Sequence, residues 1–119
     1  MNKNEIIVFE TNLLGRHEEK YLKMGAQFGN PFDKQGNTYA IPTVDITLKR
    51  KLPLSLIKIY VNKFLNYAYD RPDFEFFVEE MGCDSMYKKC IMAELFEEAQ
   101  EIKNIKLSKG FLAELNKEY

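Results

Sequence analysis

At 119 residues the chain has room for one compact domain, residues 1–119, and not for a second. Hydrophobic residues make up 45% of the sequence and aromatic residues 13%, which predicts a packed core and excludes an intrinsically disordered chain. Seventeen Lys and Arg against eighteen Asp and Glu give a formal net charge of −1. Nucleic-acid binding is therefore not expected, because it needs a concentrated basic surface.

Cysteine usage and hydropathy favour a reduced, cytoplasmic protein. Cys83 and Cys90 lack CxxC spacing, and the chain has a single histidine, so neither a zinc site nor another cofactor is expected. The first apolar run is only Ile6–Phe9, too short for a signal peptide, and no run approaches the length of a membrane span. No membrane partner is expected.

The first half of the chain predicts a strand, a helix and a second strand. Ile6–Phe9 is a continuous apolar run rich in β-branched residues, which is typical of a buried central strand. After a Gly-Arg-His turn, residues 18–28 carry a roughly helical apolar pattern that ends at a glycine. A polar loop over 30–37 leads into a short strand over 38–43.

The middle of the chain contains the clearest helix. Residues 44–53 are ambiguous: apolar and polar side chains alternate from Val44 to Lys49, which fits either a surface strand or an extended loop. Pro53 suits a first helical turn, and the apolar residues from Leu54 to Ala68 then recur at helical spacing on one wide face. Asp70 and the Arg-Pro pair after it end this helix.

The C-terminal part predicts three or four further elements. Residues 74–81 are strand-like, and a second strong helix runs from about Tyr87 to Ala99. Residues 102–107 fit a last short strand, and 111–115 fit either a terminal helix or a docking tail. The exposed strand edges, one of them near Lys49-Arg50-Lys51, leave a homodimer open.

Strands that alternate with helices indicate an α/β fold: a single compact three-layer domain with a mixed sheet and helices on both faces. In such sheets ligands bind outside the carboxyl ends of the strands. The predicted loops over 11–19, 42–45 and 82–87 leave such ends. We therefore expect the binding site at the edge where these three loops meet.

Arg16 and His17 are the only adjacent pair at this edge able to bind an anion and transfer a proton near neutral pH. The alternative is a structural cap or an ion pair, and Gly15 provides the positive φ that the turn needs in either case. Glu18 and Glu19 fit first-turn acids that favour a helix N-terminus.

Other candidates lie on the predicted strands and the last loop. Cys83 follows Gly82 at a strand end just before a helix, where a thiolate can be stabilised, although its basic neighbours are only lysines. The aromatics include Tyr39 and Tyr87, either of which can stack on a base, whereas most aromatics at such positions belong to the core.

Four short blocks together resemble a known group of proteins: VFETNLLGRH with the following FG, QGNTYAIPT, FFVEEMGCD, and the helix containing IMAELFEEA. They resemble small phage and prophage proteins of unassigned role, which are in turn similar to compact macro domains that bind ADP-ribose. The resemblance covers residues 6–99. It implies a macro-domain-like fold and a contact from Asn12 to a ribose or base. The ligand-binding residues expected on this basis are Asn12, Gly15, Arg16, His17, Gly36, Tyr39, Thr43, Gly82, Cys83 and Tyr87.

The chain departs from that group where an anionic ligand would enter. Glu18, Glu19 and Lys20 stand where members of the group have small residues, and Asp84 follows Gly82-Cys83. Two acidic walls would repel a pyrophosphate by about 1 kcal/mol per charge pair in water and by several at lower dielectric. The pocket is therefore expected to be narrower and more negative.

Three functions remain open at this point. The first is a non-catalytic phage or mobile-element protein that binds a host protein and counters a defence system. The alternative is a protein that binds or sequesters ADP-ribose or a signalling nucleotide. The third, an ADP-ribose-directed hydrolase, ranks last because the pocket offers few groups for catalysis.

Overall fold

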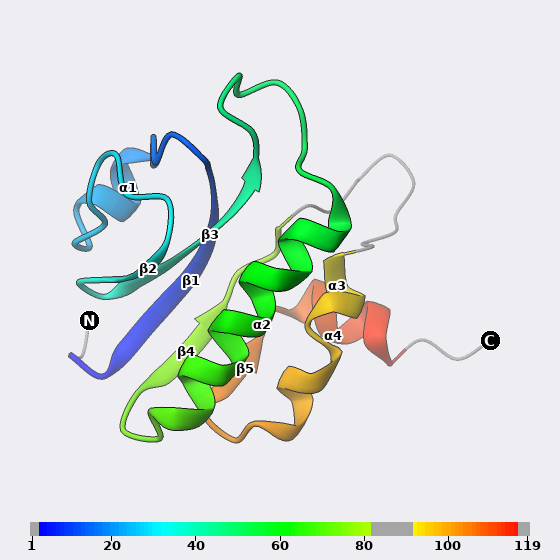
Figure 1. Cartoon of the computed structure of the whole chain (residues 1–119). Helices are drawn as coiled ribbons and strands as arrows, with labels where there is room; N and C mark the ends of the chain where they lie inside the picture. The colour runs from blue at the N-terminus through cyan, green and yellow to red at the C-terminus, as the bar shows by residue number, and fades with distance from the viewer. Residues whose placement is uncertain (1–2, 82–91, 117–119) are drawn as a thin grey trace.

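The computed structural model describes residues 3–81 and 92–116 (Figure 1). Its centre is a mixed five-stranded sheet in the order β2-β3-β1-β4-β5. The strands are β1 (Glu5–Asn12), β2 (Asp33–Gln35), β3 (Thr38–Val44), β4 (Glu75–Val78) and β5 (Ile105–Leu107). β1 pairs in parallel with β3 and β4, β4 pairs in parallel with β5, and β2 is antiparallel to β3. The α/β character, the mixed sheet and the central position of the first strand are confirmed.

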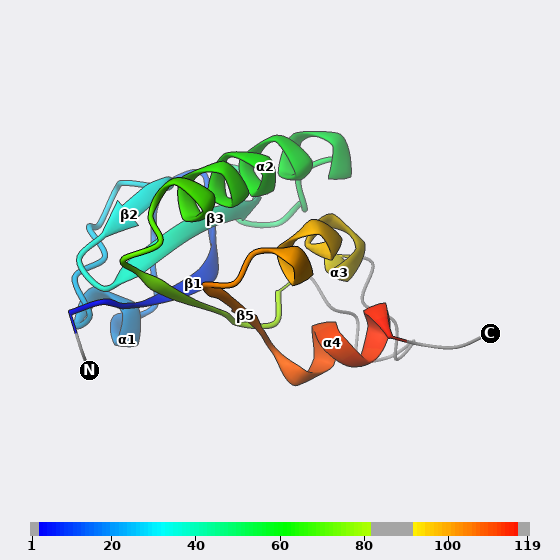
Figure 2. The same ribbon diagram turned by 90° about the horizontal axis from the view of Figure 1, so that it is seen from below.

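Helices lie on both faces of this sheet (Figure 2). The described residues form α1 (Glu19–Leu22), α2 (Leu54–Asp70), α3 (Met92–Leu95) and α4 (Lys109–Leu115), with a 3₁₀ helix over Glu97–Glu101. α2 packs on one face, and the segment around α1 packs on the other (Figure 2). The sheet is therefore covered on each side by a separate apolar cluster.

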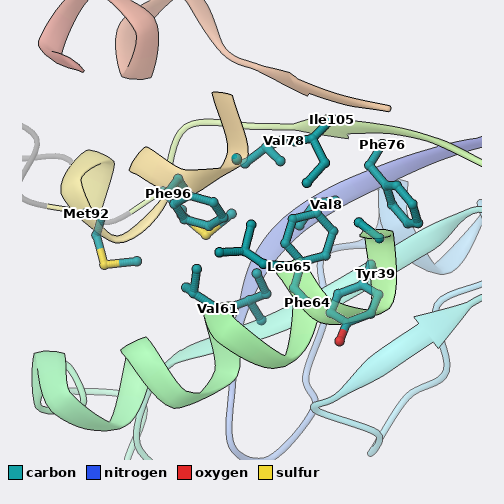
Figure 3. Packing of buried hydrophobic residues seen from close by; sticks show 14 of the residues in the cluster. Val8, Tyr39, Val61, Phe64, Leu65, Phe76, Val78, Met92, Phe96 and Ile105 are labelled. Atoms are coloured by element: carbon teal, nitrogen blue, oxygen red, sulfur yellow. The ribbon is translucent and has the colours of Figure 1, made fainter. Parts of the chain in front are cut away.

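The larger cluster follows from the apolar face predicted for α2. Its buried residues are Ile57, Val61, Phe64, Leu65 and Ala68, all of them at the predicted helical spacing. Figure 3 shows Val61, Phe64 and Leu65 of α2 facing the labelled side chains of the strands and the α3 segment. The Phe64 ring lies 5.0 Å from that of Tyr39 and 5.4 Å from that of Phe76. Each fully buried side chain of this size contributes about 1.5–3 kcal/mol. The helix predicted from Pro53 to Asp70 is confirmed.

The smaller cluster corrects the prediction of a helix over 18–28. It consists of Phe9, Tyr21, Ala26 and Ala40, with Ile7 and Met24 packed against it. Only Glu19–Leu22 is helical, because the chain turns at Gly25 (φ +109°), whose backbone packs against that of Gly36. The apolar residues after Leu22 cover the sheet from turns, so their spacing was wrongly assigned to a longer helix.

One other segment differs from the prediction, and a second confirms one of two predicted alternatives. The polar loop expected over 30–37 contains β2, a three-residue edge strand that the sequence did not indicate. Residues 44–51 form a loop that is closed by an antiparallel β-bridge between Val44 and Lys51, so the loop alternative for this segment is confirmed. Asp45 organises that loop, since its carboxylate accepts hydrogen bonds from the backbone and the hydroxyl of Thr47.

The C-terminal elements are of the predicted types, but their lengths differ from the prediction. Residues 82–91, with the start of the helix expected at Tyr87, lie outside the described residues. The part that follows is α3 and then a 3₁₀ helix, so no continuous helix reaches Ala99. β5 confirms the last strand. Of the two alternatives for 111–115 the helix is confirmed, with Ser108 Oγ accepting from the Phe111 N–H at 3.2 Å.

Asn104 joins the end of α2 to the start of β4. Its side-chain nitrogen donates to the carbonyls of Ala68 (2.9 Å), Arg71 (2.9 Å) and Phe74 (3.1 Å). Asn104→Ala leaves these carbonyls without that donor and is expected to lower the free energy of unfolding by about 1–3 kcal/mol in urea denaturation. Asn62→Ala on the exposed side of α2 is the control and should cost nothing measurable. Equal stability of the two variants would contradict this role for Asn104.

Candidate functional site

The carboxyl ends of the parallel strands β1, β3, β4 and β5 lie at one edge of the sheet, as expected for a binding site. A hollow of about 520 Å³ opens beyond β1 and β4; we call it the acidic hollow, because Glu10, Glu18, Glu79 and Glu80 line it. A second hollow of about 410 Å³ opens beyond β1 and β3, with Asn12, Thr43 and Lys51 among its lining residues.

The turn after β1 is built on Gly15. Its φ is +70°, and a Cβ there would lie 2.5 Å from both the carbonyl carbon of Gly29 and the nitrogen of Asn30. The Gly29 N–H donates to the Gly15 carbonyl at 3.0 Å. The turn and the 29–30 segment therefore touch backbone to backbone, which only glycine permits.

Asn12 closes the same turn with its side chain. Its Oδ1 accepts from the Arg16 N–H at 3.1 Å, and its Nδ2 donates to the Arg16 carbonyl at 3.0 Å. The amide thus satisfies the backbone of the turn, which Asn does readily. Its amide nitrogen and its amide oxygen both form hydrogen bonds within the chain, so a ribose or base could bind them only by replacing these bonds.

His17 is buried, with 8% of its surface exposed. Its Nδ1 lies 2.7 Å from Thr11 Oγ1, its Nε2 lies 2.8 Å from the Asn30 carbonyl oxygen, and its ring meets that of Phe9 edge-on at 5.2 Å. A carbonyl has no proton to give, so Nε2 must carry the hydrogen and donate it. Both ring nitrogens are engaged, which supports the structural alternative for this residue.

The two adjacent glutamates point in different directions. Glu18 lines the acidic hollow, whereas Glu19 lies 3.6 Å from Lys23 Nζ on the exposed surface. The exposed Glu19–Lys23 pair contributes little to stability, because solvent screens it. One of the two acids therefore shapes the hollow, and the other does not.

Tyr21 fixes the wall of the acidic hollow. Its ring stacks on that of Phe9 at 4.0 Å, and its hydroxyl donates to Glu79 Oε1 at 2.5 Å. Burial, followed by the hydrogen bond to Glu79 and the charges of Glu79, Glu18 and Glu10, raises the pKa of Tyr21. The hydroxyl stays neutral and keeps donating, so it holds Glu79 in place at the edge of the sheet.

Thr43 also turns toward a glutamate, since its hydroxyl donates to Glu10 Oε2 at 2.9 Å. Glu10 lies between the two hollows and lines both of them. An anion placed in either hollow would meet its carboxylate. Lys20, whose Nζ lies 4.8 Å from the centre of the Tyr21 ring, is the one basic residue among the described residues that line the acidic hollow.

The structure brings together only part of the predicted set. Asn12, Gly15, Arg16, His17 and Thr43 lie at the carboxyl-end edge, although the side chains of Asn12, His17 and Thr43 bind within the chain. Gly36 lies at the turn between β2 and β3, and Tyr39 is in the core. Three further predicted residues, Gly82, Cys83 and Tyr87, lie outside the described residues.

Sequence reasoning missed the acidic residues from the two central strands. Glu10 is the one exposed residue of β1, and Glu79 and Glu80 directly follow β4. A signal was present, because a charged residue that interrupts or ends a buried strand in a parallel sheet lies at the ligand-binding edge. The Gly110 backbone in α4 packs against the Glu80 carboxylate, a contact that no local pattern shows.

A scan of protein-family models, a search of curated proteins and a search of solved structures each found no match. Across residues 3–81 and 92–116, no group of three or more His, Cys, Asp or Glu side chains is placed to hold a metal ion. In the same ranges no helix has both the length and the apolar character needed to cross a membrane.

This arrangement is suited to binding positive charge. The acidic hollow combines its carboxylates with the half-buried Phe77 as an apolar lining residue, whereas the Val78 side chain belongs to the core. Cationic groups with apolar stems, such as lysine and arginine side chains, match both properties. Phosphate groups match neither, since the repulsion of several carboxylates adds to the cost of desolvation.

Gly15→Ala tests how closely the turn approaches the 29–30 segment. The expected loss is about 3 kcal/mol of unfolding free energy, since the left-handed conformation costs roughly 1–2 kcal/mol and the backbone clash adds roughly 1–3 kcal/mol. Gly29→Ala is the matched control: its φ is +86°, but nothing lies within 4 Å of the added Cβ. In urea denaturation, Gly29→Ala should lose only the roughly 1–2 kcal/mol of unfolding free energy that the left-handed conformation costs. Equal losses would show that the close approach is absent.

Proposed function

We propose that this chain is a non-catalytic protein that acts by binding a basic segment of a partner protein at the acidic hollow. The observation that supports this most is the set of four carboxylates, Glu10, Glu18, Glu79 and Glu80, at the edge where the parallel strands end. That edge is the usual binding place of α/β sheets, and here its charge selects cations.

The partner is proposed to be a host protein, with the chain carried by a phage or another mobile element and acting against a host defence system. The resemblance of the four sequence blocks to phage and prophage proteins supports this assignment. The charge of the hollow adds the chemistry of the contact: lysine or arginine side chains whose stems cover the half-buried Phe77. The scaffold is proposed to be macro-domain-like, with its nucleotide site turned into a protein-binding surface.

The polar side chains at this edge form hydrogen bonds within the chain, which supports a binding protein over an enzyme. His17, the only histidine in the sequence, uses both ring nitrogens for structural hydrogen bonds. The Asn12 side chain hydrogen-bonds to the backbone of the turn, and the Thr43 hydroxyl donates to Glu10. A general base has to reach a substrate proton, and these side chains face inward instead.

The alternative is a protein that binds ADP-ribose or a signalling nucleotide at the same edge. The parallel pairing of β1 with β3 and the glycine turn after β1 favour it, because both belong to phosphate-binding frameworks. The charge of the hollow counts against it. The enzyme form of this alternative, an ADP-ribose-directed hydrolase, would also need a free base.

A triple variant, Glu18→Gln/Glu79→Gln/Glu80→Gln, tests the partner-binding proposal. It removes three charges and preserves size, and the amide oxygen that replaces the Glu79 carboxylate still accepts the Tyr21 hydrogen bond. We expect the unmodified chain to capture a discrete partner from bacterial lysate in a salt-sensitive manner, and the triple variant to lose at least about 90% of it, because each lost contact between opposite charges weakens binding.

A second triple, Glu19→Gln/Glu98→Gln/Glu101→Gln, is the control with the same change in net charge at exposed positions outside the hollow. It should capture the partner normally and should protect phage in defended cells as the unmodified chain does. Equal capture by the two triples would contradict binding at the acidic hollow, and no protection by the unmodified chain would contradict a counter-defence role.

Thermal shift with ADP-ribose separates the two functions. Saturable binding at a hundred times Kd would stabilise the fold by about 2.7 kcal/mol, which is an easily measured shift in Tm. Because of the carboxylates at the edge we expect no such shift at millimolar ADP-ribose. A saturable shift that the Glu18/Glu79/Glu80 triple variant strengthens would establish the nucleotide alternative instead.

A further inference from the structure

A third hollow, of about 290 Å³, lies away from the acidic hollow, between the β2–β3 side of the sheet and α2. Its lining residues include Phe32, Asp33, Tyr39, Tyr60 and Lys63. The Phe32 and Tyr60 rings lie 5.2 Å apart at an angle of 40° and together form an aromatic wall. No side chain of the acidic hollow takes part, so this is a separate site.

The fold leaves this hollow open for a specific reason. β2 pairs with β3 only from Asp33 opposite Ala40 to Gln35 opposite Thr38. Pro42 comes next on that side of β3 and has no N–H to donate, so the ladder stops there. The chain enters β2 through Asp33 with a φ of +69°, a conformation that Asp tolerates better than most residues.

Tyr39 contributes a hydroxyl that has no hydrogen-bond partner among the described residues. The residue is 4% exposed, and its hydroxyl bonds to no other residue in the described part of the chain. No fully buried side-chain oxygen or nitrogen in that part lacks a partner, so this hydroxyl must open onto the hollow. Figure 3 shows the oxygen at the end of the ring that points away from Phe76 and the cluster.

Opposite charges lie on the same hollow without pairing. Neither Asp33 nor Lys63 forms an ion pair with any residue of the described ranges. Asp33 is close enough to Tyr39 that, after burial, its charge is the next cause that raises the pKa of that hydroxyl. The hydroxyl therefore stays protonated and able to donate. The hollow offers a carboxylate, an ammonium group, a hydroxyl donor and an aromatic wall.

We propose that this hollow binds a free α-amino acid with an apolar or aromatic side chain. The ligand's ammonium group would face Asp33, its carboxylate would accept from Lys63 and from the Tyr39 hydroxyl, and its side chain would lie against Phe32 and Tyr60. The volume of about 290 Å³ lies just below the range of about 300–1,000 Å³ seen for ligand pockets, which suits a single amino acid better than a nucleotide. The site is independent of the function proposed above.

Titration of the ¹⁵N-labelled chain, followed by NMR, tests this site with four defined probes. L-Phenylalanine should give saturable shifts of the amide signals of residues 32–33, 39–41 and 60–63. N-Acetyl-L-phenylalanine lacks the ammonium group, L-phenylalaninamide lacks the carboxylate, and glycine lacks the side chain. Each of these three should bind at least about tenfold more weakly, since each loses one charged or apolar contact.

Three variants assign the contacts. Tyr39→Phe retains the packed ring and should weaken L-phenylalanine binding about tenfold through loss of the donor. Asp33→Asn, which tolerates the positive φ, should bind the acetylated and free amino acids equally. Lys63→Gln should bind the amide and the free amino acid equally. Tyr69→Phe, Asp70→Asn and Lys58→Gln make the same chemical changes at exposed positions of α2 and should bind like the unmodified chain.

Three results would overturn the proposal. One is the absence of saturable shifts with L-phenylalanine and with L-leucine, which would leave water as the partner of Tyr39. Another is equal affinity for the free, acetylated and amidated amino acids, which would mean that neither charge is recognised. The last is Tyr39→Phe binding as tightly as the unmodified chain.

Discussion

The hydrogen bonds of His17 hold the turn after β1 in place. The ring joins Thr11 at the end of β1 to the Asn30 carbonyl, at 2.7 and 2.8 Å, and beside it the backbone of Gly15 meets that of Gly29. These contacts fix both ends of the segment that carries Tyr21 and Met24 onto the sheet. Since α1 has only four residues, tertiary contacts rather than helix propensity must hold that segment.

One wall of the acidic hollow depends on the segment that these contacts of His17 and Gly15 hold on the sheet. Tyr21 reaches Glu79 only because its ring is stacked on Phe9, the same residue that His17 meets edge-on. Glu18 enters the hollow as the extended residue just before α1. Glu18 and Tyr21 thus lie on the segment that the contacts of His17 join to the sheet, whereas Glu10 belongs to β1 and Glu79 and Glu80 directly follow β4. A histidine that looks reactive in the sequence uses both ring nitrogens for hydrogen bonds within the fold.

The sequence predicted those elements whose own residues determine them. α2, seventeen residues long, was predicted nearly to its ends because its buried residues recur at helical spacing from Ile57 to Ala68. The helix over 18–28 was wrong because Gly25 and Gly36, eleven positions apart, pack backbone to backbone. β2 was missed because its polar residues are held by pairing with β3. Such contacts between distant residues leave no local pattern.

The candidate site, too, was predictable where local sequence determines it and unpredictable where contacts between distant residues do. The edge of the sheet was predicted from the order of strands and helices, and Asn12, Gly15 and Thr43 do lie there. The partners of their side chains were beyond prediction, because they depend on the register of β1 with β3 and on the approach of the 29–30 segment. Tyr39 was proposed as a ligand contact at this edge, and its hydroxyl opens instead onto the hollow beside α2.

The structural role of His17 rests on the hydrogen bond from its Nε2 to the Asn30 carbonyl. Long-range ¹H–¹⁵N NMR of the imidazole measures which ring nitrogen carries the hydrogen. We expect that Nε2 carries a hydrogen that exchanges slowly with solvent, and that Asn30→Ala, which keeps the carbonyl, leaves this signal unchanged. A ring whose Nε2 hydrogen exchanges rapidly, or whose hydrogen resides on Nδ1 alone, would contradict a structural role for His17.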